Sequence, residues 1–233
     1  MFRDRRDAGR RLAERVVALS GTDAIVLGLA RGGVPVAYEV ARELAAELDV
    51  LVVRKLGVPG REELAMGAIA SGGVRILDDE LVRQLGVSEV DLESVAATEG
   101  EELQRRQQRY RGTRPPATLE RRSVILVDDG LATGSTMRAA VQSVRLQEPR
   151  RIVVAVPVAA PEICEAFAGL VDEIVCTVTP SPLVAVGLWY EDFSATSDDE
   201  VRELLAVARH PNGEDLPATS MIGSPARPPG KGP

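Results

Sequence analysis

The stretch that decides the fold is Val124-Ile125-Leu126-Val127-Asp128-Asp129-Gly130-Leu131-Ala132-Thr133-Gly134-Ser135-Thr136. Its first four residues are an unbroken apolar run, which is typical of a strand buried on both faces. Two carboxylates follow, and Gly130 and Gly134 interrupt the pattern before a helix that we predict from about Gly134 to Leu146. Ligands of open α/β sheets bind at the carboxyl ends of the strands, so this turn is the candidate binding site.

Strand and helix patterns alternate on both sides of this stretch. Short apolar runs predict further strands at residues 24–29, 50–53, 152–156 and 173–178, and segments with helical spacing lie between them. A hairpin is expected around Ser71-Gly72-Gly73, and an exposed helix over about 88–110. The alternation predicts an α/β fold with a mainly parallel twisted sheet and helices on both faces.

The ends of the chain differ in composition. Apolar residues at helical spacing from Ala8 to Leu19 predict an amphipathic first helix whose arginines face water. Residues 210–233 contain 6 prolines and 4 glycines, which is typical of a disordered tail or a linker. We therefore expect one domain over 1–209, with a core at about 20–195 and an exposed helical insertion at about 79–115.

Composition excludes several functional classes. The chain has 233 residues and a formal net charge of −7, which argues against binding of duplex nucleic acid. No apolar run is long enough to span a membrane, and the acidic start does not resemble a signal peptide, so we expect a cytoplasmic protein. His210 is the only histidine, which disfavours His-based catalysis. Cys164 and Cys176 lie in apolar stretches, and we expect both to be buried free thiols.

The turn after the two aspartates has the chemistry of a phosphate site. Its backbone N–H groups and the hydroxyls of Thr133, Ser135 and Thr136 converge at a predicted helix N-terminus, which favours an anion. No lysine follows Gly134, so this is not the nucleotide-binding P-loop. Adjacent carboxylates suit a sugar diol, held directly or through magnesium.

These residues resemble the ribose 5-phosphate signature of type I phosphoribosyltransferases. The resemblance implies that Asp128 and Asp129 hold the ribose hydroxyls of phosphoribosyl pyrophosphate (PRPP) and contribute to a magnesium site, directly or through water. It implies that the 5-phosphate is bound by the next segment of the turn, which consists of Ala132, Thr133, Gly134, Ser135 and Thr136. It also implies a small hood beside the parallel sheet, and a homodimer.

Two further loops fall where that family binds pyrophosphate. Arg31, Gly32 and Gly33 follow the first strand, where the glycines would admit a diphosphate and the guanidinium could bind it in bidentate fashion. Arg54 and Lys55 follow the second strand, and Lys55 is the only lysine before Lys231.

Glycine and proline after Lys55 predict an irregular, mobile segment up to Leu64, which corresponds to the family's flexible catalytic loop. We expect Glu63 on this loop to accept a proton from a nitrogen nucleophile. Alternatively, each charged side chain on this loop is exposed to solvent and has no catalytic role.

The acceptor site is expected in the hood, near Val184 and Trp189. Ala132 replaces the acidic residue that 6-oxopurine phosphoribosyltransferases carry in this loop, which disfavours hypoxanthine or guanine as the acceptor. Val184 stands where several purine enzymes place an aromatic residue, which argues against ordinary base stacking.

The functional hypothesis is a magnesium-dependent transfer of ribose 5-phosphate from PRPP to an unidentified acceptor, expected to be a nitrogen nucleophile, with release of pyrophosphate. The alternative is a non-catalytic protein that senses PRPP or a nucleotide with the same turn.

Overall fold

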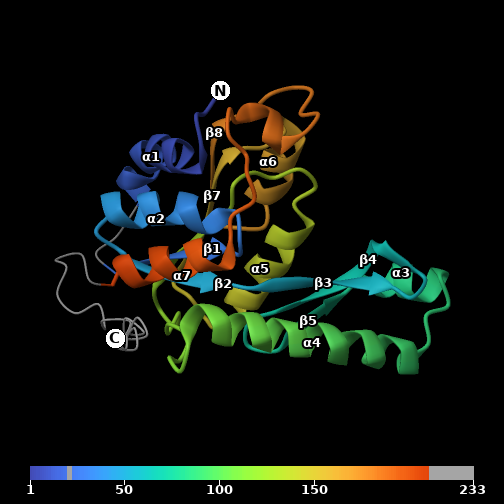
Figure 1. The fold of residues 1–233 in the computed structure, drawn as a ribbon. Helices are drawn as coiled ribbons and strands as arrows, with labels where there is room; N and C mark the ends of the chain where they lie inside the picture. The colour runs from blue at the N-terminus through green and yellow to red at the C-terminus, as the bar shows by residue number, and fades with distance from the viewer. Residues whose placement is uncertain (20–22, 210–233) are drawn as a thin grey trace, which may run out of the picture.

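The computed structural model describes residues 1–19 and 23–209. The main sheet has five parallel strands in the order β2-β1-β6-β7-β8 (Figure 1). These strands are β1 (Ala24–Leu29), β2 (Glu47–Leu51), β6 (Ser123–Val127), β7 (Arg151–Val158) and β8 (Glu173–Val178). The parallel α/β fold expected from the sequence is confirmed, whereas the predicted tail at 210–233 lies outside the described residues.

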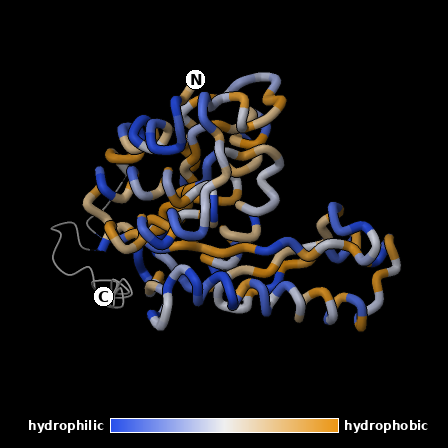
Figure 2. The backbone as a smooth tube through the Cα atoms, in the orientation of Figure 1, coloured by the Kyte–Doolittle hydropathy of each residue, from blue (hydrophilic) through white to orange (hydrophobic). Residues whose placement is uncertain are grey.

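Helices cover both faces of this sheet because consecutive strand residues point to opposite sides. Val26 and Val153 face the helices α1 (Arg5–Val16), α2 (Gly33–Glu43) and α7 (Asp198–Val207). Ile25 and Leu27 face α5 (Ser135–Arg145) and α6 (Pro161–Ala168). Figure 2 shows hydrophobic residues concentrated along the central strands, with hydrophilic stretches on the outer helices.

Residues 53–111 form an extension that we call the arm (Figure 1). It contains an antiparallel sheet in the order β3-β4-β5, made of β3 (Val53–Val58), β4 (Arg61–Ala70) and β5 (Val74–Leu77). Two helices follow, α3 (Asp79–Gln84) and α4 (Glu89–Arg111). Leu92 and Ala96 of α4 pack on Leu56 and Met66 of this sheet, so one face of the long helix is buried.

The prediction of an irregular segment up to Leu64 is wrong, because β3 and β4 form a hairpin there. Gly60 has φ +75° at its tip, a conformation that favours glycine. A Cβ at Gly57 would lie 2.6 Å from the carbonyl oxygen of Glu62, so glycine allows the two strands to approach. The same glycines that suggested irregularity are therefore the residues that permit the pairing.

The base of the arm is anchored in the core by a buried ion pair. Arg111 Nε lies 3.0 Å from Asp49 Oδ1, and each side chain is 7% exposed. A further N–H of Arg111 donates to the Val50 carbonyl oxygen at 2.5 Å, and the Ala117 N–H donates to Asp49 Oδ2 at 3.1 Å. The contacts tie the end of α4 to β2.

The chain start pairs with a segment near its other end. We call residues 189–196 the strap. It begins at the last residue of the short 3-10 helix η2 (Val186–Trp189). The Phe2 N–H donates to the Trp189 carbonyl oxygen at 2.8 Å, and the Glu191 N–H donates to the Phe2 carbonyl oxygen at 2.8 Å. These bonds place α1 beside the strap.

The prediction of two free thiols is wrong, because Cys164 of α6 and Cys176 of β8 form a disulfide. Helix α6 packs against β8, which brings the two residues together in space.

Within the described part of the chain, no helix combines the length and hydrophobicity required to cross a bilayer.

Candidate functional site

Asp128 and Asp129 lie directly after β6, and each has one carboxylate oxygen held by the protein. Asp128 Oδ1 accepts the Asp129 backbone N–H at 2.9 Å, and Asp129 Oδ2 accepts Arg5 Nε–H at 2.9 Å. Among the residues that the structure describes, none other than Asp129 itself donates a hydrogen bond to Asp128 Oδ2 or Asp129 Oδ1, and neither atom is sealed from solvent. The pair therefore presents one uncommitted acceptor oxygen from each residue.

The surroundings of Asp128 and Asp129 disfavour the state in which both carboxyl groups are ionised. Burial raises the pKa of the Asp128 carboxyl well above its usual range, and the neighbouring Asp129 charge adds to this effect. Burial also raises the pKa of Asp129, although the Arg5 guanidinium opposes the shift. Hydroxyl donors or a cation at the free oxygens would stabilise the ionised pair.

The loop at residues 30–33, which contains the cis Ala30–Arg31 peptide bond, lies against this pair. A Cβ at Gly32 would lie 2.1 Å from Asp129 Oδ2, and one at Gly33 would lie 2.5 Å from the Val127 carbonyl oxygen. The two glycines are thus needed for the close packing of two loops, whatever ligand the loops bind.

The turn at residues 130–136 ends at the N-terminus of α5, as the sequence predicts. Gly134 caps this helix with φ +73°, and a Cβ there would lie 2.7 Å from a ring carbon of Phe167. Ala132, Thr133 and Ser135 are exposed, and the Thr133 and Ser135 hydroxyl oxygens lie 3.2 Å apart. The turn offers hydroxyl groups and helix N–H groups at the end of β6.

A cavity of about 590 Å³ lies between the arm and the turn. Arg54, Lys55 and Thr136 line it, together with Ala30 and residues of α4. Arg54 is paired with Glu99 at 2.6 Å, whereas exposed Lys55 has no ion pair among the described residues. Lys55 also lines a neighbouring cavity of about 480 Å³ that includes Ser135. The structure therefore brings this lysine, from β3 rather than from a loop, close to the predicted phosphate turn.

Glu63, the expected general base, lies next to Glu62 at the start of β4. Glu62 lines the larger cavity, and Glu63 is not among its lining residues. Both glutamates are exposed at the start of β4. Because neighbouring strand residues point to opposite sides, the hairpin turns Glu62 toward the cavity and Glu63 away from it.

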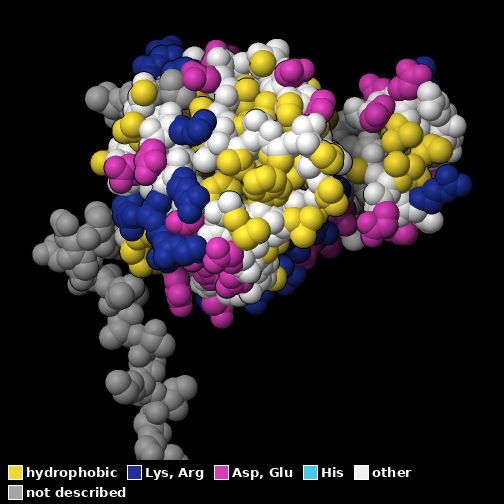
Figure 3. Space-filling model, turned by 90° about the horizontal axis from the view of Figure 1, so that it is seen from above, with side chains coloured by type: hydrophobic (Ala, Val, Ile, Leu, Met, Phe, Trp, Pro, Cys, Tyr) yellow, Lys and Arg dark blue, Asp and Glu magenta, His cyan; other side chains and the backbone are white. Residues whose placement is uncertain are grey.

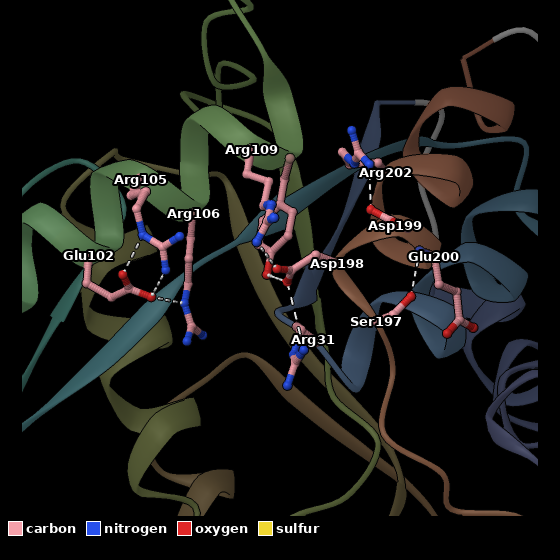
Figure 4. Close-up of polar contacts among 11 residues, drawn as sticks. Arg31, Glu102, Arg105, Arg106, Arg109, Ser197, Asp198, Asp199, Glu200 and Arg202 are labelled. Atoms are coloured by element: carbon pink, nitrogen blue, oxygen red, sulfur yellow. Dashed lines mark hydrogen bonds and ion pairs between the residues drawn. The ribbon is translucent and has the colours of Figure 1, made fainter.

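Arg31 lies in a charged cluster between the 30–33 loop, α4 and α7 (Figure 4). Its guanidinium is 3.9 Å from Asp198 Oδ1, and Asp198 also accepts hydrogen bonds from Arg109 at 2.5 Å and Tyr110 at 2.7 Å. The Tyr110 hydroxyl bond is the main cause that lowers the pKa of the Asp198 carboxyl. Burial and the same bond raise the pKa of Tyr110 to about 12. Arg31 thus rests beside a carboxylate that has two closer donors.

The two expected hood residues have different surroundings. Val184 is 78% exposed, and Trp189 packs in a small apolar cluster with Phe2 and Tyr190. Figure 3 shows apolar side chains gathered on the face that is uppermost in Figure 1. Val184 and Leu188, near the predicted acceptor site, and Phe193 of the strap are exposed hydrophobic residues.

Sequence reasoning missed Arg5 and the contact that Tyr190 makes with the site. The expectation that the arginines of the first helix face water is wrong for Arg5, whose side chain is only 12% exposed. The Tyr190 hydroxyl donates to the Asp129 carbonyl oxygen at 2.6 Å. Arg5 lies three residues before Ala8 and seven before Leu12, so helical spacing places it on the buried face of α1 and was the signal that could have found it. Only the pairing with the strap shows which groups it meets there.

Comparisons with known proteins point to one domain family. The family profile of the phosphoribosyl transferase domain matches residues 59–166, a range that includes the acid pair and the turn but neither Arg31 nor Lys55. In Mycobacterium tuberculosis, strains CDC 1551 and H37Rv each have a protein named provisionally as a phosphoribosyl transferase. Each is 48% identical over 229 residues, which is 98% of this chain and 51% of the relative.

The crystal structure of TT1426 from Thermus thermophilus is 46% identical and has a TM-score of 0.77, covering 88% of this chain and 97% of that one. Residues 59–166 of the chain belong to the phosphoribosyl transferase domain family. The chain spans about half the length of the curated relatives that it matches.

Proposed function

We propose that this chain binds PRPP with magnesium and transfers its ribose 5-phosphate to an acceptor, with release of pyrophosphate. The observation that carries the proposal is the acid pair at the end of β6, which has one free oxygen on each aspartate. Two adjacent ribose hydroxyls are two donors, and two separate acceptor oxygens match them. The hydroxyls and N–H groups at residues 132–136 would then bind the 5-phosphate.

The donor set at the pair fits magnesium only in part. Among the described residues, no cluster of three or more acidic, histidine or cysteine side chains could hold a metal ion by itself. Magnesium is usually bound by one or two carboxylates together with substrate phosphates and water, so Asp128 and Asp129 fit a site that the substrate completes. When bound, the ion would neutralise charge on the diphosphate.

The protein groups would act by position and charge. Lys55 would bind the leaving diphosphate, and Arg31 would add a second cation after leaving Asp198. The acceptor nitrogen forms a bond to the anomeric carbon while the bond from that carbon to the diphosphate oxygen breaks. The electron pair of the broken bond stays with pyrophosphate, and the proton of the acceptor passes to a carboxylate such as Glu62.

Calorimetry tests binding directly. We expect PRPP with magnesium to bind the wild type, and to lose affinity by at least tenfold in the Asp128→Asn/Asp129→Asn variant. Equal affinities would contradict the proposal. Thermal melts of both proteins control for folding.

A second candidate is a non-catalytic PRPP or nucleotide sensor. It is favoured by the exposed position of aliphatic Val184, which offers no aromatic ring to an acceptor base, and by the packing of Trp189 against an apolar cluster. Pyrophosphate release in the presence of purines, pyrimidines, orotate or small amines would support the enzyme. Tight PRPP binding without release across this panel would support the sensor.

We further propose a homodimer, as the family resemblance implies, and a cytoplasmic location, as the sequence start suggests. Light scattering of the purified chain tests the dimer, and fractionation of cells that produce it tests the location.

A further inference from the structure

Arg5 makes three contacts with one guanidinium group. Its Nε–H donates to Asp129 Oδ2 at 2.9 Å, and another N–H donates to the Ser194 carbonyl oxygen at 2.6 Å. The plane of the group lies over the Phe193 ring, with 4.0 Å between the guanidinium carbon and the ring centroid. Arg5 is therefore bound to the acid pair on one side and to the strap on the other.

This arrangement is enclosed. The side chains of Arg5 and Asp129 are 12% and 16% exposed, in contrast to the surface pairs of α1, such as Arg11 with Asp7, in which Arg11 is 48% exposed. An ion pair with little solvent contact holds its geometry more firmly than a surface pair, because screening by water and salt is weaker.

The contact selects one oxygen of Asp129. Arg5 occupies Oδ2, the atom that also lies nearest to the Cβ position of Gly32, so Oδ1 is the oxygen left for a ligand. The carboxylate is further restrained because the Tyr190 hydroxyl donates to the carbonyl oxygen of the same residue at 2.6 Å. The strap and α1 together determine which oxygen Asp129 can offer.

We propose that Arg5 is a positioning residue for the PRPP site: it holds Asp129 through Oδ2 and presents Oδ1 to the pentose hydroxyls. This inference rests on the proposed function and extends it, because it assigns a role to a residue of the N-terminal helix outside the PRPP signature. Removal of a residue that orients a metal ligand typically lowers metal affinity by about 10- to 100-fold, and we expect an effect of the same order for this sugar-binding carboxylate.

The test measures PRPP affinity by calorimetry at a fixed magnesium concentration. Arg5→Gln removes the charge, and we expect affinity to fall about tenfold or more. Arg5→Lys keeps a cation that can still reach Asp129, and we expect it to recover part of the loss. In an Asp129→Asn background, Arg5→Gln should cause little further loss, because Arg5 acts through that carboxylate.

Arg11→Gln is the matched control. Arg11 lies on the same helix, pairs with Asp7 at 2.9 Å and stacks on the Phe2 ring, but does not contact the acid pair. We expect its PRPP affinity to stay within about twofold of the wild type. Thermal melts of every variant separate a loss of folding from a loss of affinity.

Three results would overturn the inference: an Arg5→Gln affinity equal to that of the wild type, equal losses in Arg5→Gln and Arg5→Lys, or additive losses in the Asp129→Asn background. If Arg5→Gln does not fold, Arg5→Lys in the two backgrounds decides the matter by the same criterion of additivity. Failure of the wild type itself to bind PRPP would overturn the proposed function as well, whereas normal binding with an unaffected Arg5→Gln variant overturns this inference alone.

Discussion

The Tyr190 hydroxyl donates a hydrogen bond to the backbone carbonyl oxygen of Asp129 at 2.6 Å. Tyr190 is 6% exposed, and burial raises the pKa of its hydroxyl, so the group remains a donor throughout the neutral range. This bond joins the strap to the residue that the site uses, although the two residues are 61 positions apart in the chain.

Tyr190→Phe removes this bond and keeps the ring. We expect a loss of about 1–3 kcal/mol in the free energy of unfolding, because a largely enclosed carbonyl loses its partner. We also expect a several-fold loss of PRPP affinity. Urea unfolding and calorimetry measure the two effects. Tyr38→Phe serves as the control, since no hydroxyl bond of Tyr38 is observed among the described residues; an equal effect in both variants would argue against a specific role for Tyr190.

Gly32→Ala tests the packing of the 30–33 loop on the acid pair. The new Cβ would lie 2.1 Å from Asp129 Oδ2, so either the loop or the carboxylate has to move. We expect destabilisation of about 1–3 kcal/mol together with loss of PRPP binding. In Gly169→Ala the new Cβ meets nothing within 4 Å, and its φ of −89° suits alanine, so that variant should retain both properties. Unaltered PRPP binding by Gly32→Ala would show that the site does not require the close packing of the 30–33 loop against Asp129.

Lys55→Ala separates ligand binding from stability. Lys55 is exposed and has no ion pair within the described ranges, so the free energy of unfolding should change by less than about 0.5 kcal/mol. We expect PRPP affinity to fall about tenfold or more, because a cation facing the diphosphate is lost. Arg61→Ala, at an exposed position at the start of β4, removes a charge of the same sign and should have a much smaller effect. Similar losses in both variants would indicate general electrostatic attraction rather than a contact.

Asp198→Asn tests the charged cluster around Arg31 through its pH dependence. The folded protein lowers the pKa of Asp198 below its ordinary value of 3.8, mainly through the Tyr110 hydroxyl. A lowered pKa contributes stability above pH 3.8, and that stability is lost as the pH falls through the folded-state value. We therefore expect the variant to be less stable than the wild type at pH 7, with the difference shrinking below about pH 4. Urea midpoints at several pH values measure it, and a gap that widens in acid would contradict the assignment.

Much of the fold follows from local patterns that can be read along the chain. The unbroken apolar run at 124–127 predicts a buried strand, and alternation with helical segments predicts the parallel sheet. The glycine pair Gly72-Gly73 also predicts the hairpin between β4 and β5. Both glycines adopt positive φ values in the structure, a conformation that glycine tolerates. The hairpin of β3 and β4 is not predicted, because its pairing depends on a close approach at Gly57 that composition does not reveal.

The amino-acid sequence by itself determined the strand, the acid pair and the phosphate turn, because these features are contiguous and their chemistry depends on residue type and spacing alone. Tertiary structure alone decided that Arg5 reaches Asp129, that Glu62 rather than Glu63 lines the cavity, and that Cys164 meets Cys176. The period of a helix or strand determines which face a residue lies on, but the groups that this face meets depend on how segments far apart in the sequence pack together.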